Sequence, residues 1–359
     1  MTDAAPNELG ALRARIDSID DAILKLVSER AGIAQQVGHA KKGEKIYRPE
    51  REAQIVRRLR ETNPGPLSGE VVERLIREIV SACRALEQTT RIAYLGPAGT
   101  FSQQAVHKHF GHEAEALAEA DIDTCFRAVE TGRADFAVVP VENSTEGAVG
   151  RTLDLIVSSP LKICSEVMLP IHQTLMRKHV SLEGIARVYG HAQSLAQCQQ
   201  WLRRHLPNAE RVSVVSNSEG ARLAAADPAA ATLGSEAAAE LYGLAVIEAC
   251  VEDEATNTTR FLVLGKADAA PSGRDKTSLV MGAKNQPGAV VKLLQPLADA
   301  GISMSKLESR PARGSNWEYL FFVVCNGHRQ DSKMVAALAE IETRAAFLKV
   351  LGSYPAAAS

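Results

Sequence analysis

The sequence predicts a multidomain chain with an all-α N-terminal domain, an α/β middle domain and an α+β C-terminal domain. A helical apolar pattern opens the chain, short apolar runs alternate with helical stretches in the middle, and the order βαββαβ ends it. A length of 359 residues suffices for two or three domains. The patterns put the domains at 1–90, 91–266 and 276–359, with a linker at 267–275.

Composition excludes several classes of function. Lys plus Arg number 41 and Asp plus Glu 43, a formal charge of −2 that argues against non-specific nucleic-acid binding. No apolar run approaches the roughly 20 residues that cross a bilayer, and the first residues lack the features of a signal peptide. The six cysteines include no CxxC pair, which favours reduced thiols and excludes a disulfide framework or a thiolate zinc site. We expect a cytoplasmic protein with no nucleic-acid or membrane partner.

The N-terminal region predicts one long helix followed by two shorter ones. Apolar residues recur at steps of three and four along the first helix; they are Leu9, Leu12, Ile16, Ile19, Ile23, Leu26, Ile33 and Val37. This helix should end near Gly43, a second should run from Glu50, after Pro49, to about Glu61, and Ser68 should cap a third. Three helices of these lengths cannot cover so long a seam, so we expect a homodimer or a higher homo-oligomer.

A charged residue, Arg30, occupies a seam position between Leu26 and Ile33. It is either a polar residue that sets the register of a coiled coil or a cation held in the bundle to bind an anion. Lys41 shares its face about three turns, or about 16 Å, further along. Arg13 is 28 residues from Lys41, about 42 Å on a straight helix, so it can serve the same kind of site only in a partner subunit.

With these cations, residues 9–88 resemble the all-helical chorismate mutase family. The matching positions are Leu12-Arg13, Glu29-Arg30, Lys41, Tyr47 to Glu52, and Glu87-Gln88. The resemblance implies a rearrangement of chorismate to prephenate at a site shared across an intertwined dimer. It implies these substrate-binding residues: Arg13, Arg30, Lys41, Arg48, Glu52, Cys83 and Glu87.

The roles implied by the resemblance suit a rearrangement that needs no nucleophile, metal or cofactor. Such an enzyme must hold a dianion in a compact conformer and stabilise charge growing on the ether oxygen. Arg30 would bind a carboxylate, Lys41 and Glu87 would contact the ether oxygen, and Glu52 would contact the ring hydroxyl. A carboxylate cannot donate a hydrogen bond, so Glu87 must be protonated to act. Arg48 stands where the best-known members carry aspartate, which leaves substrate contact there to the backbone.

From residue 91 onward the pattern indicates alternating strands and helices. We expect strands at 92–95, 136–139, 161–168, 171–176 and 262–264. Four polar clusters lie at strand ends or helix starts, where an α/β domain gathers its ligand site. These clusters are Gly96 to Thr100, Pro140 to Gly147, His191 to Ser194, and Asn257 to Phe261.

Two motifs in this region are rejected as cofactor or metal sites. The turn from Gly96 to Thr100 lacks the GK[ST] of a phosphate loop and the spacing of a dinucleotide fingerprint. His107, His109 and His112 are interpreted as the surface end of a helix, because no carboxylate falls at a supporting spacing. We expect neither cofactor nor metal.

Together the four clusters resemble prephenate dehydratase over residues 91–266. The resemblance implies two lobes like those of a periplasmic binding protein, with a cleft site where prephenate loses its ring hydroxyl and carbon dioxide to give phenylpyruvate. It implies that Thr259 is essential and assists the departing hydroxyl. Asn143, Ser144 and Gln193 would position the substrate's polar groups, and Arg260 would attract a carboxylate. The alternatives are helix capping for Asn143 and Ser144, and a strand-edge position for Thr259.

The last segment predicts a ferredoxin-like fold, with strands at 277–283, 307–311, 318–325 and about 348–351. Residues 285–290 should open a helix that runs to about Ala300, and a second helix should cover about 332–347. Its Asn-x-Pro-Gly-Ala and Glu-Ser-Arg-Pro motifs resemble the ACT regulatory domains joined to dehydratases. The resemblance implies an L-phenylalanine site between paired domains, formed by Pro287, Gly288, Ala289, Val290, Glu308, Ser309, Arg310 and Pro311. An ordinary glycine–proline loop is the alternative for the first motif.

Combined, the resemblances imply a bifunctional enzyme of L-phenylalanine biosynthesis. It would take chorismate and prephenate as substrates and be inhibited by L-phenylalanine. Two alternatives remain: a dehydratase with an inert helical dimerisation arm, and a non-catalytic amino-acid-sensing protein. The presence of Arg13, Arg30, Lys41, Glu52 and Thr259 argues against the second.

Overall fold

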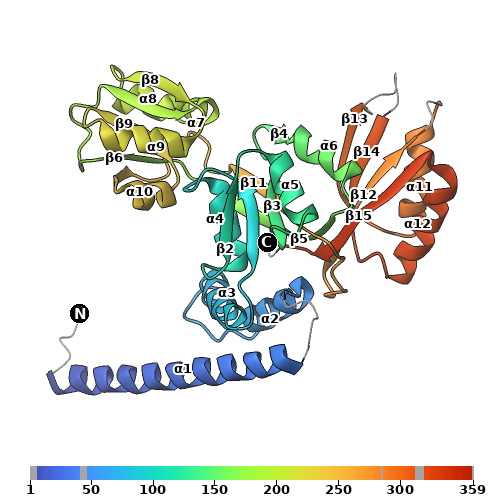
Figure 1. Ribbon diagram of the computed structural model, residues 1–359, viewed down its shortest axis with the longest axis horizontal. Helices are drawn as coiled ribbons and strands as arrows, with labels where there is room; N and C mark the ends of the chain where they lie inside the picture. The colour runs from blue at the N-terminus through green and yellow to red at the C-terminus, as the bar shows by residue number, and fades with distance from the viewer. Residues whose placement is uncertain (1–5, 41–46, 284–285, 312–318, 358–359) are drawn as a thin grey trace.

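The computed structural model describes residues 6–40, 47–283, 286–311 and 319–357. They form a helical N-terminal part, two α/β lobes and a C-terminal α+β part (Figure 1). The predicted multidomain organisation, with these three fold classes in this order, is confirmed.

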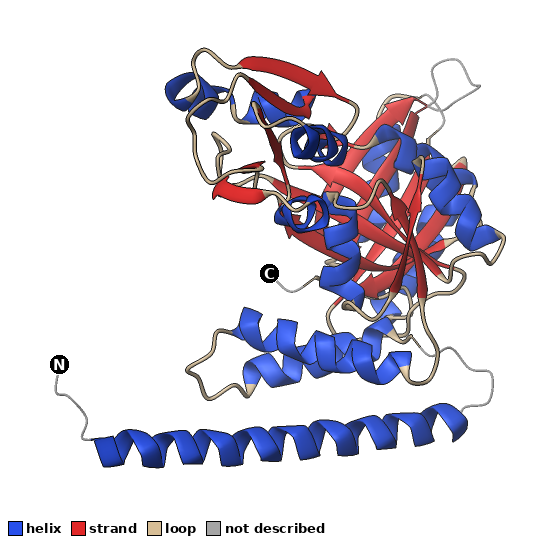
Figure 2. Ribbon diagram, turned by 60° about the vertical axis from the view of Figure 1, so that its left-hand side comes forward, coloured by secondary structure: helices blue, strands red, loops and turns tan. Residues whose placement is uncertain are grey.

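The N-terminal part consists of α1 (Pro6–Ala40), α2 (Pro49–Glu61) and α3 (Gly69–Ala85). Pro49 opens α2, and Ser68 Oγ accepts a hydrogen bond from the backbone N of Val71 at the start of α3, as predicted. α1 runs as a long rod beside the α2–α3 pair (Figure 2). Its seam residues stay 44–65% exposed within the single chain. Among the helices of the described residues, none has the length and apolar character that a membrane crossing requires.

The first lobe is built on a six-stranded sheet of order β2-β1-β3-β11-β5, with β4 paired to β3. Its strands are β1 (Arg91–Leu95), β2 (Glu115–Glu119), β3 (Phe136–Asn143), β4 (Gly147–Ala148), β5 (Lys162–Pro170) and β11 (Thr258–Gly265). Its helices are α4 (Phe101–Phe110), α5 (Ile122–Glu130) and α6 (Gly150–Ser158). β1 is parallel to β2 and β3, whereas β11 is antiparallel to both β3 and β5.

Two strands of this lobe are longer than the sequence predicts. β3 continues through Pro140 to Asn143, and β11 includes the polar cluster that was expected to precede it. The register of the β3–β11 pair shifts between Arg260 and Phe261, so Val141 is an extra residue beside Pro140. A bulge tolerates a proline because it relieves the ladder of one hydrogen bond. The predicted end of this strand at residue 139 was therefore wrong.

The second lobe is a five-stranded sheet of order β10-β6-β9-β7-β8. Its strands are β6 (Thr174–Arg177), β7 (Arg187–His191), β8 (Glu210–Val214), β9 (Ala230–Gly234) and β10 (Ala245–Glu248). Its helices are α7 (Ala192–Gln197), α8 (Gln199–His205), α9 (Asn217–Ala226) and α10 (Glu236–Tyr242). The chain enters this lobe between β5 and β6 and returns between β10 and β11, which gives the predicted two-lobed, periplasmic-binding-like arrangement.

The C-terminal part has the predicted order βαββαβ and the sheet order β13-β14-β12-β15. Its elements are β12 (Asp275–Gly282), α11 (Ala289–Asp299), β13 (Met304–Pro311), β14 (Tyr319–Asn326), α12 (Ser332–Arg344) and β15 (Phe347–Pro355). The last helix ends earlier than predicted and the last strand is longer. β15 packs on β5 of the first lobe: a Cβ on Gly352 would lie 2.2 Å from the carbonyl oxygen of Ile163. Only glycine permits so close an approach of two backbones.

The predicted linker, residues 267–275, is tied to its surroundings. Arg57 of α2 donates a hydrogen bond to the carbonyl oxygen of Ser272 at 3.1 Å, and Arg329 pairs with Asp268 at 3.0 Å. Asp275 already belongs to β12. The segment therefore connects all three parts of the chain.

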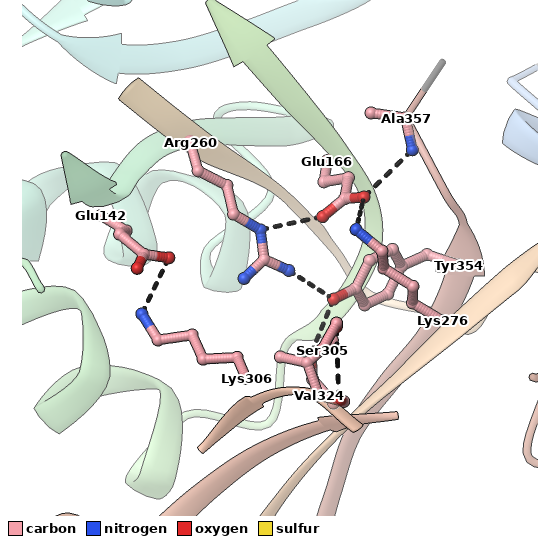
Figure 3. A network of polar contacts seen from close by, with 10 residues as sticks. Glu142, Glu166, Arg260, Lys276, Ser305, Lys306, Val324, Tyr354 and Ala357 are labelled. Carbon is pink, nitrogen blue, oxygen red and sulfur yellow. Dashed lines mark hydrogen bonds and ion pairs between the residues drawn. The ribbon is translucent and has the colours of Figure 1, made fainter. Parts of the chain in front are cut away.

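A buried carboxylate, Glu166 of β5, joins the first lobe to the C-terminal part (Figure 3). Its side chain is fully buried and accepts from Arg260 Nε at 2.8 Å, Lys276 Nζ at 2.6 Å and the backbone N of Ala357 at 3.0 Å. Burial alone would raise the pKa of Glu166, but the charges of Arg260 and Lys276 outweigh it and hold the pKa below its ordinary value. Both cations would lose a buried counter-charge if this carboxylate were neutral.

We predict that Glu166→Gln destabilises the chain near neutral pH by about 3–5 kcal/mol, because it leaves two partly buried cations unpaired. A folded-state pKa below the unfolded-state value of about 4.3 means that the stabilisation is complete above that pH and is lost as pH falls through the folded-state pKa. Thermal unfolding measured from neutral to acid pH should show the wild type and the variant converging in acid. Glu340→Gln removes an exposed helical pair with Arg344 and is the matched control. A constant difference between wild type and Glu166→Gln at every pH would contradict this prediction.

Candidate active sites

A cavity of about 530 Å³ lies between the two α/β lobes. All four predicted polar clusters contribute to its lining, which includes Gly96, Thr100, Asn143, His191, Gln193, Ser194, Asn257 and Thr259. The clusters meet because they follow β1, β3 and β7 or begin β11, and the ends of these strands face the gap between the two sheets.

The orientation of the Asn143 amide is fixed by its surroundings. Its Oδ1 accepts hydrogen bonds from the backbone N of Thr145 at 3.0 Å and of Glu146 at 3.2 Å. Because backbone N–H groups can only donate, Oδ1 must face them and Nδ2 must face the other way. Nδ2 donates to Thr259 Oγ1 at 2.8 Å and to Asn257 Oδ1 at 2.9 Å.

This geometry gives the Thr259 hydroxyl a defined role. Thr259 is the register partner of Asn143 in the β3–β11 ladder, and its residue exposure is 9%. Its Oγ1 is the acceptor in the bond from Asn143, so the hydroxyl proton is not used there. The threonine can donate that proton to an oxygen bound in the cavity, and the bond from Asn143 strengthens it as a donor.

The cavity also contains three amide side chains that the sequence did not single out. Asn257 is buried and donates to Gln197 Oε1 at 3.2 Å, and Gln173 Nε2 donates to the same oxygen at 3.4 Å. The Oε1 atom of Gln173 is buried and has no hydrogen-bond partner within the described residues. Two of these residues carried a signal: Asn257 begins a predicted cluster, and Gln197 lies one helical turn after Gln193.

Two residues predicted to bind substrate are not part of this lining. Ser144 Oγ accepts from the backbone N of Thr258 at 2.9 Å, so it bridges β3 and β11. Arg260 is buried on the opposite face of β11, where it binds Glu166 and Tyr354. Its direction follows from strand alternation: since Thr259 faces the cavity, the next side chain faces away.

The cavity lining contains no arginine or lysine among the described residues. Phe101 and Ser102 of α4 and Asn217 of α9 line it, so the N-terminal turns of two ten-residue helices reach it. Helix N-termini attract anions through unpaired N–H groups and the helix dipole. Glu219 is the carboxylate of the lining, and a hydrogen bond from Arg222 lowers its pKa.

A second cavity, of about 380 Å³, lies among α1, α2 and α3. Three arginines line it with apolar residues: Arg30 from α1 and Arg51 and Arg58 from α2. Such a concentration of guanidinium groups suits a dicarboxylate. Arg51 and Arg58 were not among the predicted site residues, although Arg51 lies within the matching stretch from Tyr47 to Glu52.

Other predicted residues of the helical site lie elsewhere in the single chain. Glu52 is on another face of α2 and forms an ion pair with buried Arg84 at 2.5 Å, so the structure does not bring it to the cavity of Arg30. Cys83 is buried within α3. The Glu87 carboxyl lies against Gly38 of α1, where a Cβ would be 2.5 Å from its Oε2.

Three further cationic residues were predicted to bind the substrate of the helical site. Arg13 is exposed on α1, seventeen residues and so about 26 Å before Arg30. Arg48 precedes α2 and pairs with Glu50 at 2.7 Å. Lys41 lies outside the described residues.

The histidine cluster lies at the end of α4, as predicted, and His112 is exposed, but the cluster as a whole is not on the surface. His109 is buried and its Nε2 is 2.5 Å from Tyr47 Oη, while burial holds the pKa of His109 well below its ordinary value. The His107 and His112 rings stack at 4.7 Å. Elsewhere in the described chain, His172, Cys250 and Glu252 place three metal-ligand atoms within 4.8 Å of one another. The Glu252 carboxylate already accepts from the backbone N of Gln173 at 2.8 Å.

The two predicted regulatory segments lie on separate elements of the C-terminal part. Gly288 is the N-cap of α11 and has φ 74°, a left-handed conformation that suits glycine. Pro287 is exposed, whereas Ala289 and Val290 are half-buried. On β13, Glu308 contacts Lys306 at 3.1 Å and Arg310 approaches Asp154 of α6 at 3.6 Å, with Ser309 and Pro311 exposed between and after them.

Comparison with known proteins assigns each part. The family model for chorismate mutase type II matches residues 12–88, that for prephenate dehydratase 92–269, and that for the ACT domain 277–343. A bifunctional chorismate mutase/prephenate dehydratase of Neisseria gonorrhoeae is 54% identical over 348 residues, 96% of each chain. One from Stutzerimonas stutzeri is 48% identical over 359 residues, 98% of each chain. The structure of prephenate dehydratase from Arthrobacter aurescens in complex with L-Phe aligns with a TM-score of 0.69 and 33% identity, covering 74% of this chain and 90% of that one.

The fold, with one cavity between the lobes and one among the helices, therefore defines a multidomain enzyme in which a helical mutase domain precedes a two-lobed dehydratase and a regulatory ACT domain. The chain belongs to the family of bifunctional chorismate mutase/prephenate dehydratases. Both activities, and a place in phenylalanine biosynthesis, follow from that membership.

We predict that Arg51→Met raises the KM for chorismate about tenfold or more, since a hydrogen bond to a charged group contributes about 1.5–3 kcal/mol. Chorismate consumption measured over a range of substrate concentrations tests this. Arg74→Met, which removes an exposed arginine of α3, is the control. Unchanged mutase kinetics in Arg51→Met would show that this cavity is not the mutase site.

Proposed function

We propose that prephenate is dehydrated in the cavity between the two lobes and that Thr259 and Asn143 carry the reaction. The supporting observation is the 2.8 Å bond from Asn143 Nδ2 to Thr259 Oγ1, which leaves the threonine proton available to the substrate. In the reaction the bond between the ring and its hydroxyl oxygen breaks, and the oxygen keeps the electron pair. The bond between the ring and its carboxylate also breaks; its electrons complete the aromatic ring, and carbon dioxide leaves.

In this mechanism Thr259 donates a hydrogen bond to the departing oxygen, which leaves as water after it takes a proton from solvent. A threonine hydroxyl is a poor acid, so its contribution is stabilisation of developing charge rather than full proton transfer. Gln193 orients the substrate's polar groups. Ser144 contributes through its hydrogen bond with the backbone N of Thr258. Arg260 contributes from the face of β11 that is opposite the cavity.

Substrate binding in this cavity depends on dipoles. Prephenate carries two carboxylates, whereas the described lining offers no cationic side chain. Hydrogen-bond donors take the place of a cationic side chain. They are the N–H groups at the start of α4 and α9 and the amide side chains of Gln193, Gln197 and Asn257.

For the mutase reaction we propose a site built on the arginine-lined cavity of Arg30. It is completed by Lys41 and Glu87 and by Arg13 of a second subunit. The exposed seam of α1 supports a homodimer, because eight apolar side chains in line on one helix are typical of a surface that another chain covers.

For the ACT domain we propose feedback inhibition by L-phenylalanine, bound by residues 287–290 and 308–311. The support is the open space around Gly288 and the position of β13 at the edge of its sheet. The domain limits that we propose are 1–90, 91–266 and 276–359. A cytoplasmic location is supported by six cysteines that are all free thiols.

Thr259→Ala should lower the dehydratase rate at least a hundredfold, the scale of losing one donor to a developing oxyanion. The mutase rate should stay unchanged, and Thr259→Ser should retain dehydratase activity because it keeps the hydroxyl. Phenylpyruvate formation from prephenate and chorismate loss are the two measurements. Thr258→Ala changes the adjacent threonine, which is outside the cavity lining, and is the matched control. Dehydratase activity retained in Thr259→Ala, or both activities lost in a folded protein, would contradict the proposal.

Gly288→Val should raise the phenylalanine concentration needed for half inhibition about tenfold or more, because the side chain fills the space proposed for the ligand. A left-handed φ strains any non-glycine residue, so the control must share that strain. Gly301→Val does, since Gly301 has φ 65° at the other end of α11. Inhibition measured in both variants decides the matter: loss in Gly288→Val alone is expected, whereas loss in both or in neither contradicts the proposed site.

A further inference from the structure

The two strands that carry Asn143 and Thr259 have a second face. In the β3–β11 ladder Thr259 pairs with Asn143, and the next pair is Arg260 with Glu142. Successive side chains of a strand point to opposite faces. The first pair lines the cavity between the lobes, and the second pair faces the ACT domain.

Both members of the second pair are held by the ACT domain (Figure 3). The carboxylate of Glu142 forms an ion pair with Lys306 Nζ of β13 at 2.8 Å. The guanidinium of Arg260 donates from Nη2 to Tyr354 Oη of β15 at 2.9 Å and from Nε to Glu166 at 2.8 Å. Tyr354 is fully buried and its Oη also bonds Ser278 Oγ at 2.6 Å, so this contact is fixed on both sides.

These contacts lie close to the proposed catalytic pair along the backbone. Glu142 and Arg260 are each one residue from a member of the proposed catalytic pair, in the same β3–β11 ladder. A shift of either side chain therefore moves the backbone that sets the 2.8 Å distance between Asn143 Nδ2 and Thr259 Oγ1. A misplacement of about 1 Å can cost about a hundredfold in rate.

We propose that Glu142 and Arg260 are positioning residues of the dehydratase, through which the ACT domain holds Asn143 and Thr259 in the productive geometry. This inference rests on the role proposed for Thr259. β13 makes the coupling specific, because the strand that holds Glu142 through Lys306 also carries the 308–311 segment and contacts α6 through Arg310. A change at that segment reaches the catalytic pair without crossing the cavity.

The test is a double-mutant cycle on the pair Lys306 and Glu142 in the full-length chain. Lys306→Met and Glu142→Gln should each lower the dehydratase kcat about tenfold. The KM for prephenate should change less than about twofold, because neither residue lines the cavity. The double variant should be no slower than Lys306→Met alone, since Lys306→Met already removes the contact with Glu142 together with that to Glu308. Lys306→Arg should restore most of the rate.

Controls separate positioning from general damage. Lys333→Met removes an exposed lysine of α12 in the same domain and should leave kcat within twofold of wild type. The mutase rate should be unchanged in every variant, and the thermal unfolding midpoint should be unchanged in the variants of Lys306, Glu142 and Lys333. Tyr354→Phe removes the hydroxyl that Arg260 contacts and gives an independent second case, with a loss in kcat of about threefold.

Three results would overturn the inference: kcat unchanged in both Lys306→Met and Tyr354→Phe, additive losses in the double variant, or a rise in KM at constant kcat. A wrong role for Thr259 would give a different result: Thr259→Ala would then keep the dehydratase activity of the wild-type chain.

Discussion

The antiparallel pairing of β3 with β11 is the constraint on which the other features of the dehydratase depend. It brings residues more than a hundred positions apart into register, Asn143 beside Thr259 and Glu142 beside Arg260. The bulge at Val141 lets a proline sit in the middle of the sheet without ending it. Because side chains alternate along a strand, one ladder serves the cavity on one face and the ACT domain on the other. The chain returns from the second lobe directly into β11, so this ladder also anchors the two-lobed arrangement.

Local signals in the sequence predicted most of the fold. Pro49 and Ser68 mark the starts of two helices because a ring without an N–H and a capping hydroxyl both act within one turn. The four polar clusters likewise predicted which segments meet in the cavity. The strand at 136–139 was predicted too short because a proline at 140 is typical of a strand end unless the strand that carries it bulges there.

The direction of charged side chains was not predictable from sequence, because their partners are distant along the chain. Arg260 binds Glu166 and Tyr354, each 94 residues away, rather than a substrate carboxylate. Glu52 meets Arg84 from the neighbouring helix. Both ion pairs are largely buried, and a buried cation is stable only beside its counter-charge. Packing therefore decides which carboxylates and guanidinium groups remain for the substrate.

The two cavities that hold the predicted site residues differ in how they attract negative charge. Three guanidinium groups line the helical one, whereas helix N-termini and amides line the one between the lobes. Partial charges act over shorter distances than full ones and hold a ligand through its individual carboxylates. When the ring carboxylate departs as neutral carbon dioxide, the bound molecule loses one of its two negatively charged groups in the same step. In the proposed reaction, turnover therefore weakens the binding of the product, because the lining offers phenylpyruvate no arginine or lysine among the described residues.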